Sequence, residues 1–369
     1  MMRRALRANA GLLFAGMASF VLMGAGQALY GPALPAFARA FGLQGQAPGL
    51  LISAHWVGAA LGVGVMFLRG GSVTPRLTLA AMAAGAALVA AGLIWALVLL
   101  GAVLFGLGYG ASTVIYNRRF LASFGARGPA MLGLVNAVFG IGAIGAPLVF
   151  VWLGSQPQLA FGLVAGLAVL TLAGAGGAGR EQVAALLPGR FVVQPGILAF
   201  GAVAIGMEAC LIGLGPTALI AAGETETRAA ELLSAFFVAF LLMRVGLVWL
   251  STRLRPFTLL MLALAGAGVS ALGAATISAA WFFVPLGACA GLFFPAFYVC
   301  AAARMGDDPR VSPTIIASGL AGGIVSPLVL GGVVALLGNG VFFWIVAGVT
   351  LAAAATGSLM PGRMNRVPA

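Results

Sequence analysis

Twelve runs of about twenty apolar residues divide this chain almost from end to end, and they constrain its fold more than any other feature. A helix rises about 1.5 Å per residue, so roughly 20 residues span the ~30 Å hydrocarbon core of a bilayer. The sequence predicts membrane-spanning helices at 11–31, 48–68, 77–93, 96–117, 129–153, 158–177, 196–222, 229–250, 257–277, 279–302, 312–337 and 341–360. The expected fold class is an all-α integral membrane protein with twelve transmembrane helices.

The composition indicates that lipid is the main solvent of this chain. Hydrophobic residues make up 62% and charged residues only 7%, whereas a soluble domain carries roughly 25% charged residues. The 56 glycines suit helices that approach one another closely. All three cysteines, Cys210, Cys289 and Cys300, fall inside predicted spans, so we expect no disulfide framework, no metal site and no cofactor.

The arginines predict an orientation. The net charge is +12 and the sequence contains no lysine. Sixteen arginines precede the first span, follow the last one or occupy every second connection, whereas Arg39 and Arg228 lie in the other connections and Arg244 lies within a span. Because cytoplasmic loops carry the excess of positive charge, both termini are expected in the cytoplasm, in a bacterial inner membrane. The charge is thereby explained without a nucleic acid partner.

An internal repeat predicts two halves. One constant shift along the sequence aligns Gly31-Pro32 with Gly215-Pro216 and Arg69 with Arg253, and a shift smaller by four aligns Pro147 with Pro327. A small loop deletion explains the difference between the two shifts. We therefore expect an N-terminal six-helix bundle at 1–177, a cytoplasmic connecting loop at 178–195 and a C-terminal six-helix bundle at 196–369.

Four predicted spans contain glycines beside polar, acidic or aromatic residues. These segments are Gly106-Leu-Gly108-Tyr-Gly110 with Asn117 after it, Asn136-Ala-Val-Phe-Gly140-Ile-Gly142, Gly206-Met-Glu208 and Gly291-Leu-Phe-Phe-Pro295. Together with Arg244 nine residues before Arg253, they resemble the major facilitator superfamily, in particular its fucose-permease-like sugar transporter branch, over nearly the whole chain. The resemblance implies two six-helix bundles related by pseudo-two-fold symmetry, and transport by alternating access.

The sequence departs from this family at several charged positions. Leu68 and Thr252 stand where the superfamily places an acid before the loop arginine, and Gly31 and Thr113 stand where fucose permease carries acids. Sugar specificity and proton coupling therefore do not carry over from the resemblance.

Three ionisable side chains fall deep inside predicted spans, where a charge costs about 2.5–3.5 kcal/mol or more. Glu208 is expected to bind substrate or take up a proton, the alternative being a structural carboxylate. Arg244 is expected to gate the inner side with Arg69 and Arg253, either by reaching the interface or by capping helix carbonyls; the alternative is pairing with an anionic substrate or with Glu208. His55 is a candidate pH-sensitive group, the alternative being a packing residue.

Uncharged polar groups supply the remaining candidates for a substrate site, because amides, hydroxyls and aromatic faces recognise sugar-like solutes. With Glu208 they are Gln27, Tyr30, Tyr109, Thr113, Asn117, Asn136 and Tyr298. For the three tyrosines, helix packing with a locally satisfied hydroxyl is an equal alternative.

Several kinds of chemistry lack their residues. A chain without lysine has no phosphate-binding loop of the ATPase type, and one histidine with one intramembrane acid falls short of an enzyme active site. We therefore expect a monomeric secondary transporter for a small organic solute, with a sugar-like solute favoured and protons as a candidate coupling ion. Two alternatives stay open: an exporter of drugs or hydrophobic metabolites, and a non-transporting membrane scaffold or assembly factor.

Overall fold

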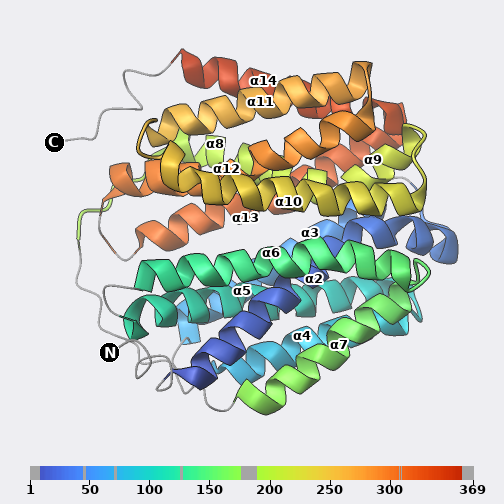
Figure 1. Ribbon diagram of the computed structural model, residues 1–369, viewed down its shortest axis with the longest axis horizontal. Helices are drawn as coiled ribbons and strands as arrows, with labels where there is room; N and C mark the ends of the chain where they lie inside the picture. Colours follow the sequence, from blue (N-terminus) through green and yellow to red (C-terminus); the bar gives the residue numbers. More distant parts are fainter. Residues whose placement is uncertain are drawn as a thin grey trace. The chain divides into compact units, whose positions relative to one another are not determined.

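The computed structural model describes residues 9–44, 47–69, 73–124, 128–175, 189–306, 308 and 310–359 as helices joined by short loops (Figure 1). The chain divides into two compact units, which we call unit 1 (Met1–Gly42 and Ala54–Ala184) and unit 2 (Leu43–Ser53 and Ala185–Ala369). Most of the connecting loop predicted at 178–195 lies outside the described residues, so its expected boundaries stay a prediction.

The helices follow the predicted spans in order. In the first half they are α2 (Ala10–Phe41), α3 (Ala47–Arg69), α4 (Pro75–Ala91), α5 (Trp95–Ser123), α6 (Gly128–Trp152) and α7 (Pro157–Gly174). In the second half they are α8 (Pro195–Gly213), α9 (Gly215–Ala221), α10 (Glu226–Leu250), α11 (Pro256–Thr276), α12 (Ala279–Met305), α13 (Val311–Leu337), the short 3₁₀ helix η4 (Asn339–Val341) and α14 (Phe342–Ser358). Within the described residues, ten helices are long and apolar enough to cross a membrane, and Pro75–Ala91 and Ala137–Trp152 are shorter apolar helices. The chain is a multi-pass integral membrane protein.

Two spans differ from their predicted form. Helix α2 continues well past the expected end at residue 31, through Pro32 and Pro35, and stops at Gly42 in the left-handed conformation (φ 61°). The span predicted at 196–222 is broken at Leu214 into α8 and α9. Pro216 at the start of α9 has no N–H to donate back to α8, and a new hydrogen-bond series begins where Ala218 N–H donates to Leu214 O.

Short side chains set several helix ends. The hydroxyls of Thr74, Thr225 and Ser278 accept hydrogen bonds from backbone N–H groups three residues later, at the starts of α4, α10 and α12. Such caps satisfy N–H groups that have no partner within the helix. Proline in the first turn adds to this in α4, α7, α8, α9 and α11.

The same helix pairs recur within each unit. In unit 1, α2 packs on α6, and α4 packs on α5 and α7; in unit 2, α8 packs on α13, and α11 packs on α12 and α14. Close backbone approaches recur as well. A Cβ at Gly106 would overlap His55 O, and a Cβ at Gly291 would overlap Phe240 O. Gly291 follows Gly106 by the same number of residues as Phe240 follows His55.

A second recurring approach explains the two shifts of the sequence repeat. Gly142 lies against Val21 O in unit 1, and Gly322 lies against Ala202 O in unit 2. The displacement from Gly142 to Gly322 is smaller by five than that from Gly106 to Gly291, which agrees in direction with the small loop deletion predicted from the sequence repeat. The displacement from Gly31 to Gly215 is larger by three than the displacement from Val21 to Ala202. The break at Leu214 therefore accommodates three additional residues in unit 2.

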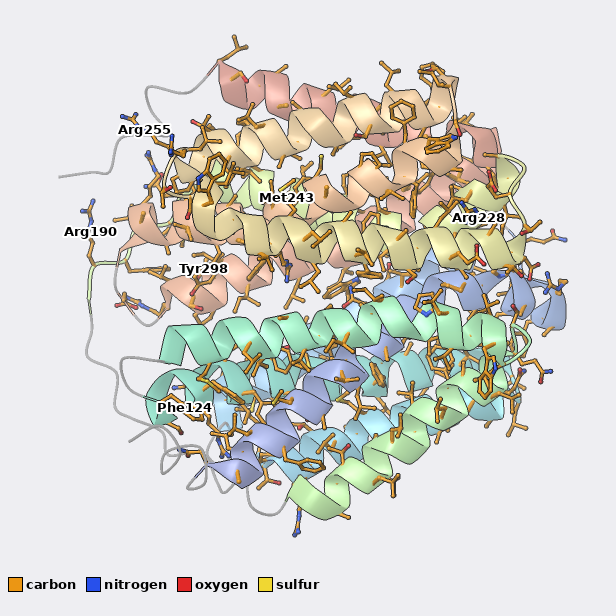
Figure 2. The ribbon with its side chains drawn as sticks, in the orientation of Figure 1. Phe124, Arg190, Arg228, Met243, Arg255 and Tyr298 are labelled. Carbon is orange, nitrogen blue, oxygen red and sulfur yellow. The ribbon has the colours of Figure 1, made fainter. Side chains whose placement is uncertain are left out.

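The arginine loops of unit 2 gather at one end of its helices. Figure 2 shows Arg190 and Arg255 at one end of this unit and Arg228 at the opposite end. This arrangement agrees with the alternation seen in the sequence, and the cytoplasmic location of the arginine-rich end stays a prediction.

Candidate functional site

Glu208 lies on α8, which packs tightly on α13, and the residue is partly exposed. Two residues before it, Gly206 faces Ser326 and the backbone of Gly322, with no room for a side chain. The Glu208 Oε2 atom is buried and has no hydrogen-bond partner among the described residues. The other charged side chain deep inside the predicted spans of unit 2 is Arg244 on α10.

Arg244 is anchored to the backbone of α12. Its Nε donates to Gly291 O at 3.2 Å, and its guanidinium carbon lies 4.3 Å from the centre of the Phe240 ring. Pro295 stands four residues after Gly291 and has no N–H, so the Gly291 carbonyl lacks its usual helical donor. Arg244 therefore caps a helix carbonyl, as one of the two sequence-based alternatives expects, while its charge also acts on Glu208.

Helix α12 also carries the candidate Tyr298, one turn after Phe294. Tyr298 donates from its hydroxyl to Ser312 Oγ on α13 at 3.0 Å, and its ring lies 5.7 Å from that of Phe294. Both aromatic residues are partly exposed, and Tyr298 is labelled in Figure 2. The Tyr298 hydroxyl is thus satisfied within unit 2, as the packing alternative expects.

In unit 1 three candidate residues lie on one face of α5. Tyr109, Thr113 and Asn117 recur every fourth residue, and all three are partly exposed. The Tyr109 hydroxyl donates to Gln27 Oε1 on α2 at 3.1 Å, and Thr113 Oγ1 donates to Tyr109 O at 2.9 Å. Asn117 Oδ1 is buried and has no hydrogen-bond partner within the described part of the chain. These residues form a continuous polar face within unit 1.

His55 lies in an aromatic cluster inside unit 1. Its ring lies 5.2 Å from Tyr30, 5.1 Å from Tyr109, 5.3 Å from Trp56 and 6.0 Å from Phe105. His55 is 1% exposed and Tyr30 is 2% exposed. Among the residues that the structure describes, neither nitrogen of His55 has a hydrogen-bond partner, and the same holds for the Tyr30 hydroxyl.

Three other candidates are placed only in part. The side chains of Asn136 and Arg69 lie outside the described part of the structure. Arg253 is exposed in the turn after α10, with its guanidinium carbon 5.4 Å from the Trp249 ring centre. The gating roles of Arg69 and Arg253 stay predictions.

The recurring contacts reveal an equivalence that the sequence alignment missed. The displacement that relates Val21 to Ala202 also relates Gln27 on α2 to Glu208 on α8. The larger displacement that relates Gly106 to Gly291 also relates two candidates on α5 to two residues on α12, namely Tyr109 to Phe294 and Thr113 to Tyr298.

The sequence landmarks conceal this relation. The shift that aligns Gly31-Pro32 with Gly215-Pro216 pairs Glu208 with Gly24 instead of Gln27, because the break at Leu214 comes after Glu208. Each unit therefore carries polar candidates at matching positions of its first and fourth spans.

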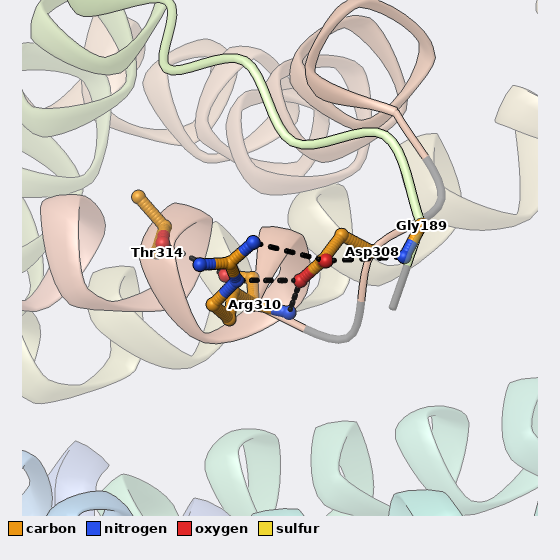
Figure 3. Close-up of polar contacts among 4 residues, drawn as sticks. All are labelled: Gly189, Asp308, Arg310 and Thr314. Carbon is orange, nitrogen blue, oxygen red and sulfur yellow. Dashed lines mark hydrogen bonds and ion pairs between the residues drawn. The ribbon is translucent and has the colours of Figure 1, made fainter. Parts of the chain in front are cut away.

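The sequence analysis also missed Asp308, which lies between α12 and α13. Its carboxylate accepts hydrogen bonds from Gly189 N at 3.2 Å and from Arg310 N at 2.9 Å, as well as from the Arg310 guanidinium (Figure 3). These donors hold the pKa of Asp308 well below its usual range. The contacts lie outside the spans, so they belong to the loop structure of unit 2.

Comparison with known proteins places this architecture. No family model and no curated protein matches the chain. Three solved structures match over 96–97% of it: a nucleoside transporter, NupG, in a mutant form (TM-score 0.77, 14% identity, 99% of that chain covered), a D-xylose-proton symporter (0.77, 11%, 98%) and a peptide transporter, POT, in complex with sulfate (0.78, 12%, 95%). The chain has the major facilitator fold.

This major facilitator fold confirms the expected class of two six-span halves. The three transporters bear names that refer to different solutes, and their similarity does not single out the fucose-permease-like branch. The site of this chain must therefore be argued from its own residues.

Proposed function

We propose that this chain is a secondary transporter that moves a small, sugar-like organic solute by alternating access, with Glu208 as the group that takes up the coupled proton. The observation that carries the proposal is an acidic side chain inside the membrane, with one buried oxygen that lacks a hydrogen-bond partner among the described residues. Ionisable groups in such positions are characteristic of proton relays in transporters. The likeness to structures of a symporter and two other transporters supports the same class.

The proton is assigned to Glu208 in preference to His55. The charge of Arg244 acts on Glu208, so a change in protonation there alters a pair of charges to which a solute can respond. His55 is enclosed by aromatic rings and is only 1% exposed. His55 stays a secondary candidate for proton coupling.

The solute contacts are proposed to come from the candidate polar groups. Gln27, Tyr109 and Asn117 offer amide and hydroxyl groups, which match the hydroxyls of a sugar. The full proposed set adds Tyr30, Thr113, Asn136, Glu208 and Tyr298.

Reconstituted liposomes test the coupling. Wild-type protein should accumulate solute when an inward proton gradient is imposed. Glu208→Gln removes the titrating group but keeps the shape of the side chain, so accumulation should be lost while exchange of internal for external solute persists. Glu231→Gln, in the exposed Arg228–Glu231 pair, is the matched control. Equal gradient-driven accumulation by wild type and Glu208→Gln would refute the assignment.

An exporter of hydrophobic compounds on the same fold is the second candidate. It is favoured by the rings around Tyr109, which lie 6.0 Å away in Trp56 and 6.4 Å away in Phe139. A strain that lacks the gene should then become sensitive to toxic hydrophobic compounds. No flux of any solute, with a stable protein partner copurifying, would instead indicate a scaffold or assembly factor.

A further inference from the structure

Unit 2 contains a permanent positive charge that is fixed in place inside the membrane. Arginine remains protonated at all physiological pH values. The Arg244 guanidinium is bound at Nε to the carbonyl that Pro295 leaves without a donor, and it lies over the Phe240 ring. These two contacts hold the charge at α12 and favour that position over the membrane surface.

Glu208 is the titratable counterpart of this charge. The helices that pack on α8 are α9, α12, α13 and α14. Of these, α9, α13 and α14 contain no titratable side chain, and the titratable side chains of α12 are Cys289, Tyr298, Cys300 and Arg304. Glu208 on α8 and Arg244 on α10 are the charged side chains deep inside the predicted spans of unit 2. Within the described residues, the protonation of one acid therefore decides the net charge of this pair.

The charge balance then determines which solute fits. With Glu208 ionised the pair is neutral, and with Glu208 protonated it carries one positive charge. An uncompensated charge inside the membrane is energetically costly, and a bound monoanion removes that cost. The planar guanidinium is suited to a carboxylate, which it can bind through two parallel hydrogen bonds.

We infer that the solute is a hydroxylated monocarboxylate, of the sugar-acid class, whose carboxylate binds Arg244 when Glu208 carries a proton. This inference rests on the proposed transport function and narrows its sugar-like solute to an anionic one. One proton and one monoanion cross together, so the transport step is electroneutral. Glu208 and the solute carboxylate are alternative partners of the same guanidinium.

Binding of matched compounds tests the charge requirement. Purified protein is titrated with a panel of hydroxylated monocarboxylates of two to seven carbons, including D-glucuronate and D-gluconate, each paired with its neutral amide. At least one carboxylate should bind about tenfold or more tightly than its amide, and its affinity should rise as the pH falls. Glu208→Gln should retain that binding and lose its pH dependence. A panel in which no carboxylate exceeds its amide would overturn the inference.

Variants at Arg244 test the residue. Arg244→Gln should weaken carboxylate binding by about tenfold or more, and Arg244→Lys should give an intermediate loss because it keeps the charge but not the fork of donors. Arg255→Gln removes an exposed arginine outside the spans and should change nothing. If Arg244→Gln elutes as an aggregate, the inference is tested by the carboxylate affinity of Arg244→Lys and by the pH dependence of carboxylate binding to the wild type. Wild-type affinity for the carboxylate in Arg244→Lys, together with pH-independent wild-type binding, would overturn the inference.

Flux separates this inference from the proposed function. Uptake of the selected carboxylate should be driven by a proton gradient and should not respond to an imposed membrane potential. Accumulation of a neutral sugar that requires Glu208 but not Arg244 would overturn the anion site and leave the transporter proposal intact. Carboxylate binding through Arg244 without flux of any compound would support the anion site and overturn the transporter proposal.

Discussion

Asp308 and Arg310 are joined by two side-chain hydrogen bonds, from Nε to Oδ1 at 2.8 Å and from Nη2 to Oδ2 at 3.1 Å. Around this pair the chain that enters unit 2 is fastened to the loop after α12. Asp308 N–H donates to Arg190 O at 3.2 Å, and Val192 N–H donates to Met305 O at 2.9 Å. The Asp308 carboxylate is therefore the centre of a clasp at one end of unit 2.

Asp308→Asn should lower the thermal stability of the protein at neutral pH, because the clasp loses its charge-assisted hydrogen bonds. Since the pKa of Asp308 is lowered in the folded state, its contribution is fully present above its unfolded value, near 3.8, and is lost as the pH falls below that. Thermal unfolding in detergent between pH 3 and 7 measures both effects. Glu231→Gln, in a pair whose side chains are 55% and 43% exposed, should change stability by less than about 1 kcal/mol. An equal loss in both variants would contradict the role of Asp308.

Gly322→Ala should destabilise unit 2, since its Cβ would overlap the carbonyl oxygen of Ala202 and force α8 and α13 apart. Overpacking of this kind costs roughly 1–3 kcal/mol. Gly348→Ala is the control, because nothing lies within 4 Å of the added atom. Thermal unfolding of both variants in the same detergent would show whether the loss is confined to Gly322.

Tyr109→Phe should separate the polar face of unit 1 from its packing. The variant keeps the ring beside His55 but removes the donor to Gln27 Oε1. A buried acceptor left without its donor costs roughly 1–3 kcal/mol, so stability should fall by that order and solute affinity should fall with it. Unchanged affinity, measured by equilibrium binding to the folded variant, would remove Tyr109 and Gln27 from the solute site.

Pro295→Ala should reduce transport without lowering the melting temperature. The new N–H of residue 295 can donate to Gly291 O within α12, so the helix gains a hydrogen bond while Arg244 loses its acceptor. Pro285→Ala is the matched control in the same helix, because the carbonyl it affects, Trp281 O, is not the acceptor of Arg244. Transport assays and thermal unfolding on the two variants check the prediction. Full transport by Pro295→Ala would show that the anchoring of Arg244 is dispensable.

Hydropathy and arginine spacing predicted the spans because both follow from local composition. All twelve predicted spans are occupied by helices, and most ends agree within a few residues. The repeat was also readable, since landmarks such as Gly31-Pro32 and Gly215-Pro216 survive in both halves. The fold was therefore accessible from the sequence.

The exact partners within the site were not accessible in the same way. The capture of the Gly291 carbonyl by Arg244 joins residues 47 positions apart, and no local pattern specifies which arginine meets which freed carbonyl. The equivalence of Gln27 and Glu208 was hidden because the landmark Gly215-Pro216 lies after the break at Leu214 and Glu208 lies before it. The three extra residues at the break change the shift between the two positions. The sequence did not point to Asp308, because a loop acid near an arginine is usually solvated. Its hydrogen bond from Gly189 N–H joins it to a distant part of the chain, which no local pattern predicts.

The glycines that face backbone carbonyls, among them Gly106, Gly142, Gly291 and Gly322, place the steric demands of this architecture on few positions. A main-chain oxygen cannot rotate aside as a side chain can, so at each crossing point a methyl group is already too large. At lipid-facing positions, almost any apolar residue is compatible with the bilayer. Chains that agree at only 11–14% of positions can thus share one scaffold, and attempts to diversify this one should leave the crossing points alone and vary the lipid-facing surface.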